Sequence, residues 1–155
     1  EQEESGAWFG RWGTNYIYGT WSVLVALEFA RVAVDHPMMR RAAAWLKSVQ
    51  RDDGGWGETN DSYETAALAG AAPRSSAFQT AWAILGLLAA GEGECDAVRR
   101  GIEYLIRQQT TDGLWDGAEF TAPGFPRVFY LKYHGYDKFF PLWALARYAR
   151  LSHTH

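Results

Sequence analysis

Residues 41–56 read RAAAWLKSVQRDDGGW, and residues 100–115 read RGIEYLIRQQTTDGLW. In both stretches an arginine, an aromatic residue, a leucine, a glutamine, a glycine and a tryptophan occupy the same relative positions. A third copy, shorter at its start, reads QEESGAW over residues 2–8. The Gln and Trp residues that define the three copies are Gln2, Trp8, Gln50, Trp56, Gln109 and Trp115. A repeat of this length predicts a stack of similar units, each built from a pair of helices.

One class of helix precedes the second and third copies. Apolar residues recur there at i, i+4 and i+7, at Met39, Ala43 and Leu46 and again at Val98, Ile102 and Leu105. Charged residues lie between them, so each segment is an amphipathic helix with one solvated face. Pro37 suits the first helical position of one, and Asp96 suits the N-cap of the other.

A second class of helix lies between these, over residues 16–30 and 77–90, where apolar residues occur on nearly every side. A helix that is apolar all round is buried all round. Ser75 or Ser76 can cap the start of the later one, and Gly91 can end it. Amphipathic and fully apolar helices therefore alternate, as in an outer and an inner ring. The sequence predicts an all-α fold, a partial α/α toroid, in one domain over residues 1–155.

The Gln-to-Trp motifs are interpreted as structural braces. A glutamine amide at the last turn of a helix can bond the unpaired terminal carbonyls, while Gly-x-Trp turns the chain. Each motif would then tie one helix end to the next unit. Asp52, Asp53 and Asp112 belong to these turns, where turn geometry explains them better than acid catalysis.

Composition limits the classes of function. The chain has 155 residues, 48% hydrophobic and 15% aromatic, with a formal net charge of −3. No long run of one charge favours nucleic-acid binding, and no apolar run is long enough to span a bilayer. Cys95 is a single cysteine and cannot form an internal disulfide. The acidic start at residues 1–4 lacks the features of a signal peptide and is interpreted as a cut through a longer chain.

The repeated pattern resembles the QW motif of squalene–hopene and oxidosqualene cyclases. Residues 8–20, 76–83 and 124–136 are also similar to that family, and the first and last of these resemble the bacterial squalene–hopene cyclases more than the sterol-forming ones. The resemblance covers essentially the whole chain but only the C-terminal part of such an enzyme. It implies an α6/α6-barrel type of toroid, in which inner and outer helices are joined by QW turns.

The resemblance also implies an activity. The parent would be an intramolecular lyase or isomerase that converts squalene to hopene or hopanol through a proton-initiated carbocation cascade, without a cofactor. The family acid lies in an Asp-x-Asp-Asp motif that is absent from this sequence, so no catalytic residue is assigned here and the isolated chain is expected to be inactive. The implied partners are squalene and the remainder of the cyclase. The parent would be peripheral to the cytoplasmic side of a membrane and this chain soluble; a homodimer stays open.

Aromatic faces attract carbocations without acting as bases, by about 0.5 to 2 kcal/mol each. Phe125, Phe129, Tyr133 and Tyr136 fall at i, i+4, i+8 and i+11 and would share one face if the stretch is helical. The resemblance implies that Phe125 and Phe129 stabilise late cations, with the two tyrosines on or behind the wall. It also implies that Trp12 lines the cavity nearer the acid and that Tyr18 lies beneath or behind the acid. Arg11 and Asn15 are instead expected to hold the loop. An ordinary aromatic core remains the alternative for each.

The same residues support other functions less well. His134 lies in an aromatic stretch and is not expected to act in acid–base chemistry, and His36, His153 and His155 lack the spacing of metal ligands, so no metal is expected. A carbohydrate-binding module would carry its aromatic residues on exposed loops, and a helical-repeat binding module would have polar inner helices. A cyclase acting on oxidosqualene or another polyprene remains a further alternative.

Overall fold

The computed structural model describes residues 1–152; His153 and His155 lie outside the described residues. The elements follow one another in the order α1 (Tyr16–Phe29), α2 (Pro37–Ser48), the short 3₁₀ helices η1 (Asn60–Tyr63) and η2 (Ala66–Leu68), α3 (Ala77–Ala89), α4 (Asp96–Arg107), β1 (Ala122–Phe125), β2 (Phe129–Leu131) and α5 (Tyr136–Ser152). Helices therefore dominate the described part of the chain, as the sequence predicts.

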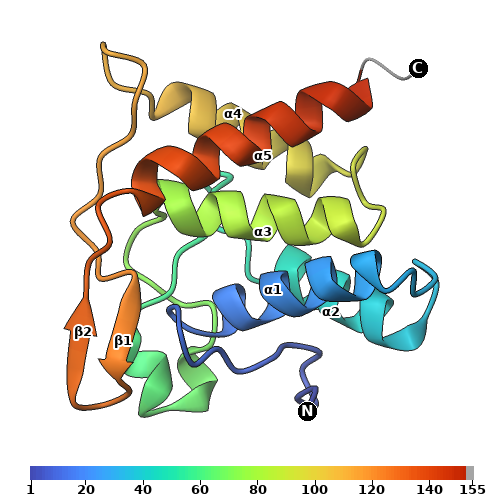
Figure 1. Cartoon of the computed structure of the whole chain (residues 1–155), viewed down its shortest axis with the longest axis horizontal. Helices are drawn as coiled ribbons and strands as arrows, with labels where there is room; N and C mark the ends of the chain where they lie inside the picture. Colours follow the sequence, from blue (N-terminus) through green and yellow to red (C-terminus); the bar gives the residue numbers. More distant parts are fainter. Residues whose placement is uncertain (153–155) are drawn as a thin grey trace.

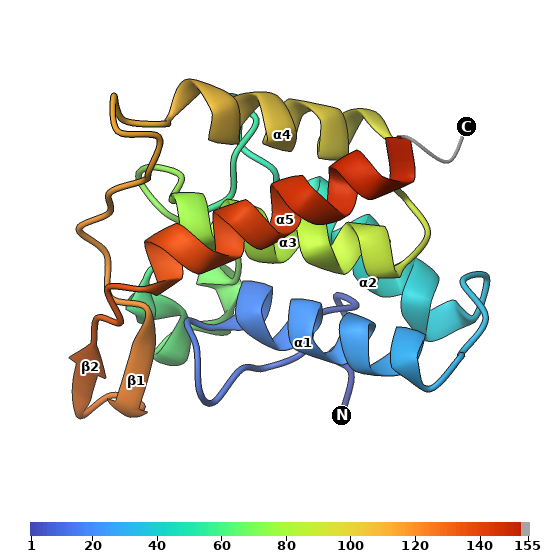
Figure 2. The same ribbon diagram turned by 45° about the horizontal axis from the view of Figure 1, so that its top comes forward.

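The helices form two layers (Figure 1). Helix α3 lies between α1 and α5 and packs extensively against both, and these three form the inner layer. Helix α4 packs on the back of α3, and α2 lies behind α1 and α3. The two layers match the predicted alternation of inner and outer helices. Figure 2 shows α4 above and α1 below, with α5 crossing in front of α3 between them and α2 behind.

The three inner helices run in the same direction. Their N-terminal ends all lie on the side of the molecule that holds the β1–β2 hairpin (Figure 1). The hairpin is antiparallel, pairs Ala122 with Leu131 and Pro123 with Tyr130, and has an irregular register between Pro123 and Phe125. The loops that precede the inner helices therefore meet at one end of the layer.

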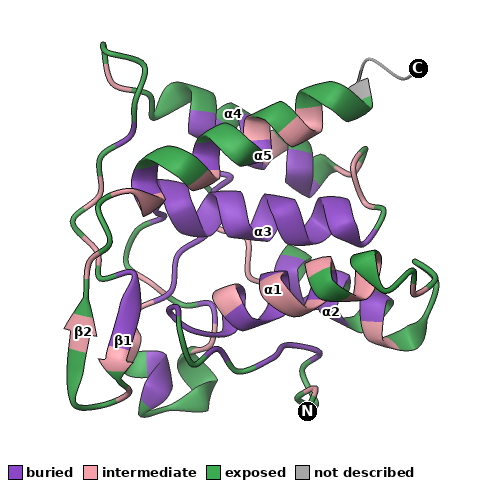
Figure 3. Ribbon diagram, in the orientation of Figure 1, coloured by how far each residue is buried: buried purple, intermediate pink, exposed green. Residues whose placement is uncertain are grey.

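Helix α3 is the centre of the core, since all of its residues from Ala77 to Ala89 are buried (Figure 3). Its start and end agree with the sequence prediction: the Ser76 side chain accepts a hydrogen bond from the Gln79 backbone N–H, and Gly91 follows the helix with a φ of +77°. A positive φ is strained for residues with a Cβ, so a glycine there ends the helix.

The expectation of burial on all sides is wrong for α1. Only part of that helix is buried, and Phe29 at its end is 82% exposed. Helix α5 is likewise open on one flank, with Phe139 71% and Leu142 62% exposed. Both helices lie at the edges of the inner layer, where one flank has no neighbour among the described residues. Each of these two helices therefore has an apolar flank that is open to solvent.

The outer helices are amphipathic as predicted. Met39, Ala43 and Leu46 are buried on α2, and Val98, Ile102 and Leu105 are buried on α4. Pro37 is the first residue of α2, as expected. Asp96 is not the N-cap of α4, because the helix begins at Asp96 itself and Cys95 holds the cap position. The Asp96 carboxylate instead pairs with Arg99 one turn later.

The motif tryptophans, and not the glutamines, bond the carbonyls that the outer helices leave free. The Trp56 indole N–H donates to the Leu46 carbonyl at 2.7 Å, and the Trp115 indole N–H donates to the Leu105 carbonyl at 2.8 Å. Those carbonyls lie in the last turns of α2 and α4, where the backbone has no i+4 partner. The expected role of the glutamine amide at its own helix end was therefore wrong.

The glutamine amide joins neighbouring units instead. Gln50 Nε2 donates to the Gly54 carbonyl in its own turn and to the Ala97 carbonyl in the first turn of α4, each at 2.8 Å. The predicted brace between units is therefore present, although its contacts run forward to the next outer helix. Asp53 serves the turn geometry as expected, because its Oδ1 accepts from the Gly55 N–H at 2.9 Å.

Within residues 1–152, no helix combines the length and the apolar character needed to cross a bilayer.

Candidate functional site: an aromatic wall at one end of the inner helices

The condition for one shared helix face through Phe125, Phe129 and Tyr133 is not met, because this stretch is a hairpin and a loop that end where α5 begins at Tyr136. The sequence holds the reason. Proline fixes its own φ, lacks an N–H and disfavours helical backbone in the residue before it, and prolines stand at 123 and 126. The argument from one shared helix face therefore fails, and other contacts bring these aromatic residues together.

Phe125 and Phe129 form one group, on paired positions of the two strands. Their ring centroids are 5.8 Å apart and the rings meet edge to face. Phe125 and Trp12 line the same open cleft of about 520 Å³. The residues that line this cleft are Phe9, Arg11, Trp12, Tyr63, Gly124, Phe125, Pro126 and Arg127. Trp12 is 68% and Phe125 65% exposed, so both rings offer most of their surface to whatever occupies this side.

Tyr18, Tyr133 and Tyr136 form a second group around a residue that sequence reasoning did not select. The rings of Tyr133 and Tyr136 stack at 5.1 Å, and Tyr136 lies 5.8 Å from Trp82. Tyr18 also lies 5.1 Å from Trp82. Trp82 is fully buried on α3 and contacts Tyr18 and Tyr136, while Tyr133 joins the group through Tyr136. Its place on the helix that is apolar on every side was the signal that could have found it.

The loop that carries Trp12 is held by Tyr63 and Asn15. The Tyr63 hydroxyl lies 2.9 Å from the Gly10 carbonyl and 2.8 Å from the Gly13 carbonyl, and donates to this pair. Asn15 Oδ1 accepts from the Gly10 N–H at 3.1 Å, so the expected role of Asn15 in holding the loop is confirmed. Trp12 is thus exposed on a loop whose ends are fixed.

Glu58 holds the start of α1. Its carboxylate accepts hydrogen bonds from the backbone N–H groups of Asn15, Tyr16 and Ile17, at 3.3, 3.1 and 2.9 Å. These are N–H groups that a helix leaves without partners at its first turn. Burial raises the pKa of the Glu58 carboxyl above its ordinary value, and the hydrogen bonds oppose that rise. Sequence reasoning missed Glu58, because a single acidic residue in a loop carries no pattern.

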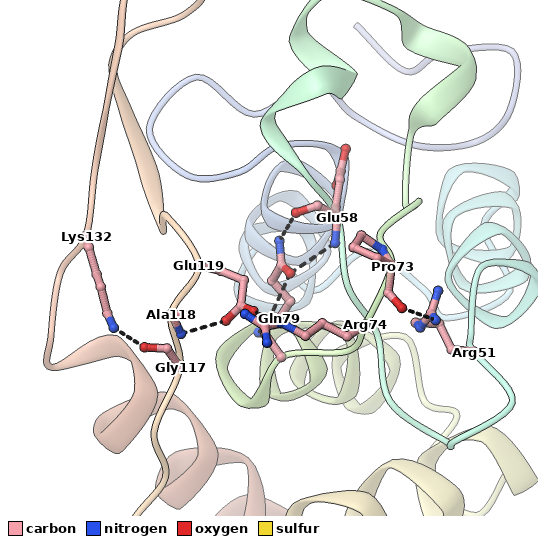
Figure 4. Close-up of polar contacts among 10 residues, drawn as sticks. Arg51, Glu58, Pro73, Arg74, Gln79, Gly117, Ala118, Glu119 and Lys132 are labelled. Atoms are coloured by element: carbon pink, nitrogen blue, oxygen red, sulfur yellow. Dashed lines mark hydrogen bonds and ion pairs between the residues drawn. The ribbon is translucent and has the colours of Figure 1, made fainter.

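Gln79 connects Glu58 to α3 (Figure 4). The Gln79 side chain accepts from the Glu58 N–H at 3.0 Å and donates to the Glu58 carbonyl at 2.9 Å. It also lies 3.3 Å from the Thr14 carbonyl, which it reaches through the same Nε2. One buried amide thus fixes the Glu58 segment, the end of the Trp12 loop and the inner helix α3 relative to one another.

The two groups of aromatic residues, called the aromatic wall below, are uncharged and so suit contact with a cation. Burial raises the pKa of Tyr18 and of Tyr136, so both phenols stay neutral at physiological pH. A neutral aromatic ring attracts positive charge through its face and takes up no proton. The Glu58 carboxylate is buried beside the start of α1, where it accepts hydrogen bonds from three backbone N–H groups.

Asp137 gives a pH-dependent test of this end of α5. It is 4% exposed, and its Oδ1 has no hydrogen-bond partner among residues 1–152. Burial raises the pKa of Asp137 to about 6; Lys132 lowers it, Glu119 and Asp116 raise it, and His134 lowers it. The pKa of Asp137 is higher in the folded chain than in the unfolded chain. The protonated carboxyl therefore adds to the free energy of unfolding, fully below about pH 4, and this contribution is lost as pH rises through 6.

We therefore expect the free energy of unfolding to fall by about 2 kcal/mol between pH 4 and pH 7 on account of Asp137. Urea unfolding at several pH values measures this fall. Asp137→Asn should flatten that part of the curve, whereas Asp35→Asn, at an exposed position, should leave it unchanged. Equal slopes for the wild type and Asp137→Asn would contradict the assignment.

The arrangement of the helices is similar to that of a terpene cyclase. The solved type II terpene cyclase MstE from Scytonema matches this fold with a TM-score of 0.61 and 25% sequence identity, over 81% of this chain and 34% of that one. Residues 1–150 match the squalene–hopene cyclase C-terminal domain. The chain belongs to this family, which confirms the resemblance seen in its sequence.

Curated relatives align with almost the whole of this chain. It is 60% identical over 154 residues to the squalene–hopene cyclase of Bradyrhizobium diazoefficiens, covering 99% of this chain and 23% of that protein. It is 47% identical to the dammaradiene synthase of Dryopteris crassirhizoma, covering 96% of this chain and 24% of that protein. The chain therefore spans about a quarter of the length of the curated relatives that it matches.

Proposed function

We propose that this chain supplies one wall of the cavity of a squalene–hopene cyclase, which converts squalene to hopene or hopanol through a proton-initiated carbocation cascade. The observation that carries the proposal is the aromatic wall itself. Trp12 and the Phe125–Phe129 pair present uncharged rings at the end of the inner layer where its loops meet. Rings in such places lower the energy of passing cations by about 0.5 to 2 kcal/mol each.

The proposal gives each residue a role. Phe125 and Phe129, which contact one another, would stabilise the late cations over the growing rings. Trp12 would line the cavity nearer the acid. Tyr18 would lie beneath or behind the acid, with Tyr133 and Tyr136 completing the wall. No Asp-x-Asp-Asp motif occurs in the sequence, so the proton donor would come from the rest of the enzyme.

The remaining partners are part of the same proposal. The rest of the cyclase chain would cover the exposed flanks of α1 and α5, where Phe29 and Phe139 are 82% and 71% exposed. Squalene is insoluble in water, so the complete enzyme would take it from a membrane to which it is bound peripherally, on the cytoplasmic side. A homodimer would have to form through other surfaces of the complete enzyme.

A chimera tests the proposed function. The matching 154 residues of the Bradyrhizobium enzyme, which are 60% identical, are replaced by this chain. Incubation with detergent-dispersed squalene and mass spectrometry of the extract should show pentacyclic products, at a rate within about tenfold of the unmodified host. The isolated chain should form none. A folded chimera that leaves squalene unchanged while the host converts it would contradict the proposal.

Phe129→Ala in this chimera tests the wall. Loss of one ring from the cation path should raise the share of incompletely cyclised products by about tenfold. Tyr130→Ala is the matched control, because successive side chains on a strand point to opposite faces and Tyr130 stacks on Tyr63 instead. An unchanged product spectrum for Phe129→Ala would remove Phe129 from the site.

A second candidate is cyclisation of squalene or another polyprene to a different skeleton. A relative named dammaradiene synthase is 47% identical to this chain, so the same wall is compatible with more than one product. The chimera distinguishes the two. Pentacyclic hopene-type products support the first candidate, and a tetracyclic product from this chain in the hopene-forming host supports the second.

A further inference from the structure

The tip of the β1–β2 hairpin holds a residue in a backbone conformation that side chains rarely adopt. The turn runs from Phe125 to Val128, and the Val128 N–H closes it by donating to the Phe125 carbonyl at 3.0 Å. Pro126 occupies the second position, and Arg127 occupies the third with a φ of +69°. A proline followed by a left-handed residue is the pattern of a type II turn, whose third position normally takes glycine or asparagine. The arginine therefore needs a reason other than the turn itself.

The Arg127 side chain makes a bond that a glycine cannot make. Its Nε donates to the Tyr63 carbonyl at 2.7 Å. A hydrogen bond from a charged donor is stronger than one between neutral groups. The same Nε lies 3.6 Å from a Glu64 carboxylate oxygen, but both side chains of this ion pair are mostly exposed, so it adds little. Strained backbone persists where surrounding contacts fix it, and the bond to Tyr63 is such a contact.

Tyr63 also holds the loop that carries Trp12. Tyr63 is buried on η1, which lies beside the hairpin (Figure 1). Its hydroxyl donates to the carbonyls of Gly10 and Gly13, on either side of Trp12, while its own backbone carbonyl accepts from Arg127. One buried residue is thus bonded to the Trp12 loop through its side chain and to the hairpin tip through its backbone.

The Phe129 ring moves with the hairpin. It lies directly over the backbone of Gly124 on the other strand, because a Cβ built on Gly124 would overlap this ring. It also meets the Phe125 ring edge to face. The position of the hairpin therefore determines the position of both rings.

The hairpin is attached at its base and at its tip. At the base, the Thr14 N–H donates to the Thr121 carbonyl at 3.1 Å, which joins the hairpin to the segment before α1. At the tip, Arg127 bonds to Tyr63. The Tyr130 ring also stacks on Tyr63, but its centroid distance of 6.1 Å is toward the long end of the range for aromatic pairs. A two-stranded hairpin is only marginally stable alone, so loss of the bond at the tip is expected to let the tip move.

We propose that Arg127 is a positioning residue for cyclisation, and that its bond to Tyr63 fixes the Phe125–Phe129 pair relative to Trp12 across their shared cleft. The inference rests on the proposed function, in which these rings stabilise cations. A cation must lie within about 6 Å of a ring centroid to be attracted by it. A displaced ring therefore stabilises the late cations less, and the cascade ends early.

Arg127→Gly in the chimera with the Bradyrhizobium enzyme tests this proposal. Glycine adopts the left-handed conformation freely, so the turn is kept while the guanidinium is lost. The share of incompletely cyclised products should rise by about threefold, less than in Phe129→Ala because the ring is displaced and not removed. Arg127→Asn should give the same rise, since asparagine also tolerates this conformation. The melting temperature should stay nearly unchanged in both variants.

Two control variants separate this bond from its neighbours. Glu64→Ala removes the ion pair with Arg127, and Tyr130→Ala removes the ring contact with Tyr63. Both leave the bond from Arg127 to the Tyr63 carbonyl in place, so both should keep the product ratio of the unmodified chimera. An unchanged ratio in Arg127→Gly overturns the proposal. An equal rise in either control also overturns it.

The position of the hairpin tip is measured separately, without turnover. Cysteines that carry nitroxide labels replace Val128, which is 75% exposed at the tip, and Glu103, which is exposed on α4, in the same chimera with its other cysteines changed to serine. Electron spin resonance should give a narrow distribution of distances between the labels. Arg127→Gly should widen this distribution, and Glu64→Ala should not.

The two measurements distinguish failure of this inference from failure of the proposed function. An equally narrow distribution in Arg127→Gly overturns the positioning role, whether or not the chimera is active. A wider distribution with an unchanged product ratio overturns it too. A chimera that converts no squalene contradicts the proposed function and, with it, any role of Arg127 in cyclisation, even where the distances show that Arg127 holds the tip.

Discussion

Alanine in place of Gly54 is expected to lower the free energy of unfolding of the chain by about 3 to 5 kcal/mol. Gly54 has a φ of +88°, which costs a residue with a Cβ about 1 to 2 kcal/mol. The added Cβ would also lie 2.7 Å from the Arg100 carbonyl oxygen. That oxygen belongs to α4, so the clash is relieved only by moving a packed helix away from the Gln-to-Trp turn over residues 50–56.

Gly113→Ala is the matched control for this prediction. Gly113 has a similar φ of +78° in an equivalent turn, but a Cβ there meets nothing within 4 Å. Only the backbone strain remains, so the loss should be about 1 kcal/mol. Urea unfolding of both variants in the isolated chain measures the difference. Equal losses would mean that the contact between the turn over residues 50–56 and α4 does not limit stability.

Glu58→Ala is expected to cost about 3 to 5 kcal/mol and to loosen the start of α1. The substitution leaves three backbone N–H groups, of Asn15, Tyr16 and Ile17, without their acceptor in a buried place. Each unsatisfied buried group costs about 1 to 3 kcal/mol before the structure relaxes. Urea unfolding gives the loss, and hydrogen exchange at these three amides should locate it.

Glu64→Ala serves as the comparison. Glu64 lies just beyond η1, is largely exposed and forms an ion pair with Arg127 at 3.6 Å, so its removal should cost less than about 1 kcal/mol. Glu58→Gln keeps one acceptor oxygen and should fall between the two. If Glu58→Ala were no more destabilising than Glu64→Ala, the carboxylate would not be what holds the helix start.

Much of the fold was predictable because it repeats. The spacing of apolar residues identified α2 and α4, the all-round apolar segment identified α3, and the positions of Gln, Gly and Trp identified the turns. Each copy must meet the same local requirements of packing and hydrogen bonding, so the same residues recur at the same positions. The direction of the glutamine bond was not predictable, because its acceptor Ala97 lies 47 residues from Gln50.

The candidate site was predicted less well, for physical reasons. The interval between Phe125 and Phe129 suits a helix, and it equally suits a tight hairpin that brings the two rings together. Pro123, before the interval, and Pro126, inside it, favour the hairpin. Trp82 and Glu58 act through long-range contacts, with partners on other elements, which no local pattern encodes. Only the family resemblance selected Trp12, since an exposed tryptophan in a loop has no periodic signal.

The common direction of α1, α3 and α5 has an electrostatic consequence. Peptide dipoles add along each helix, leaving about half a positive charge at its N-terminal end, and these three ends lie together beside the hairpin. Glu58 meets this charge at α1 and Asp137 at α5, whereas α3 has only the uncharged Ser76. At the same degree of burial, a carboxylic acid at the end of α3 would ionise more readily than one far from a helix start. Burial acts in the opposite direction, and at Glu58 and Asp137 it outweighs the helix charge, because the pKa of both is raised.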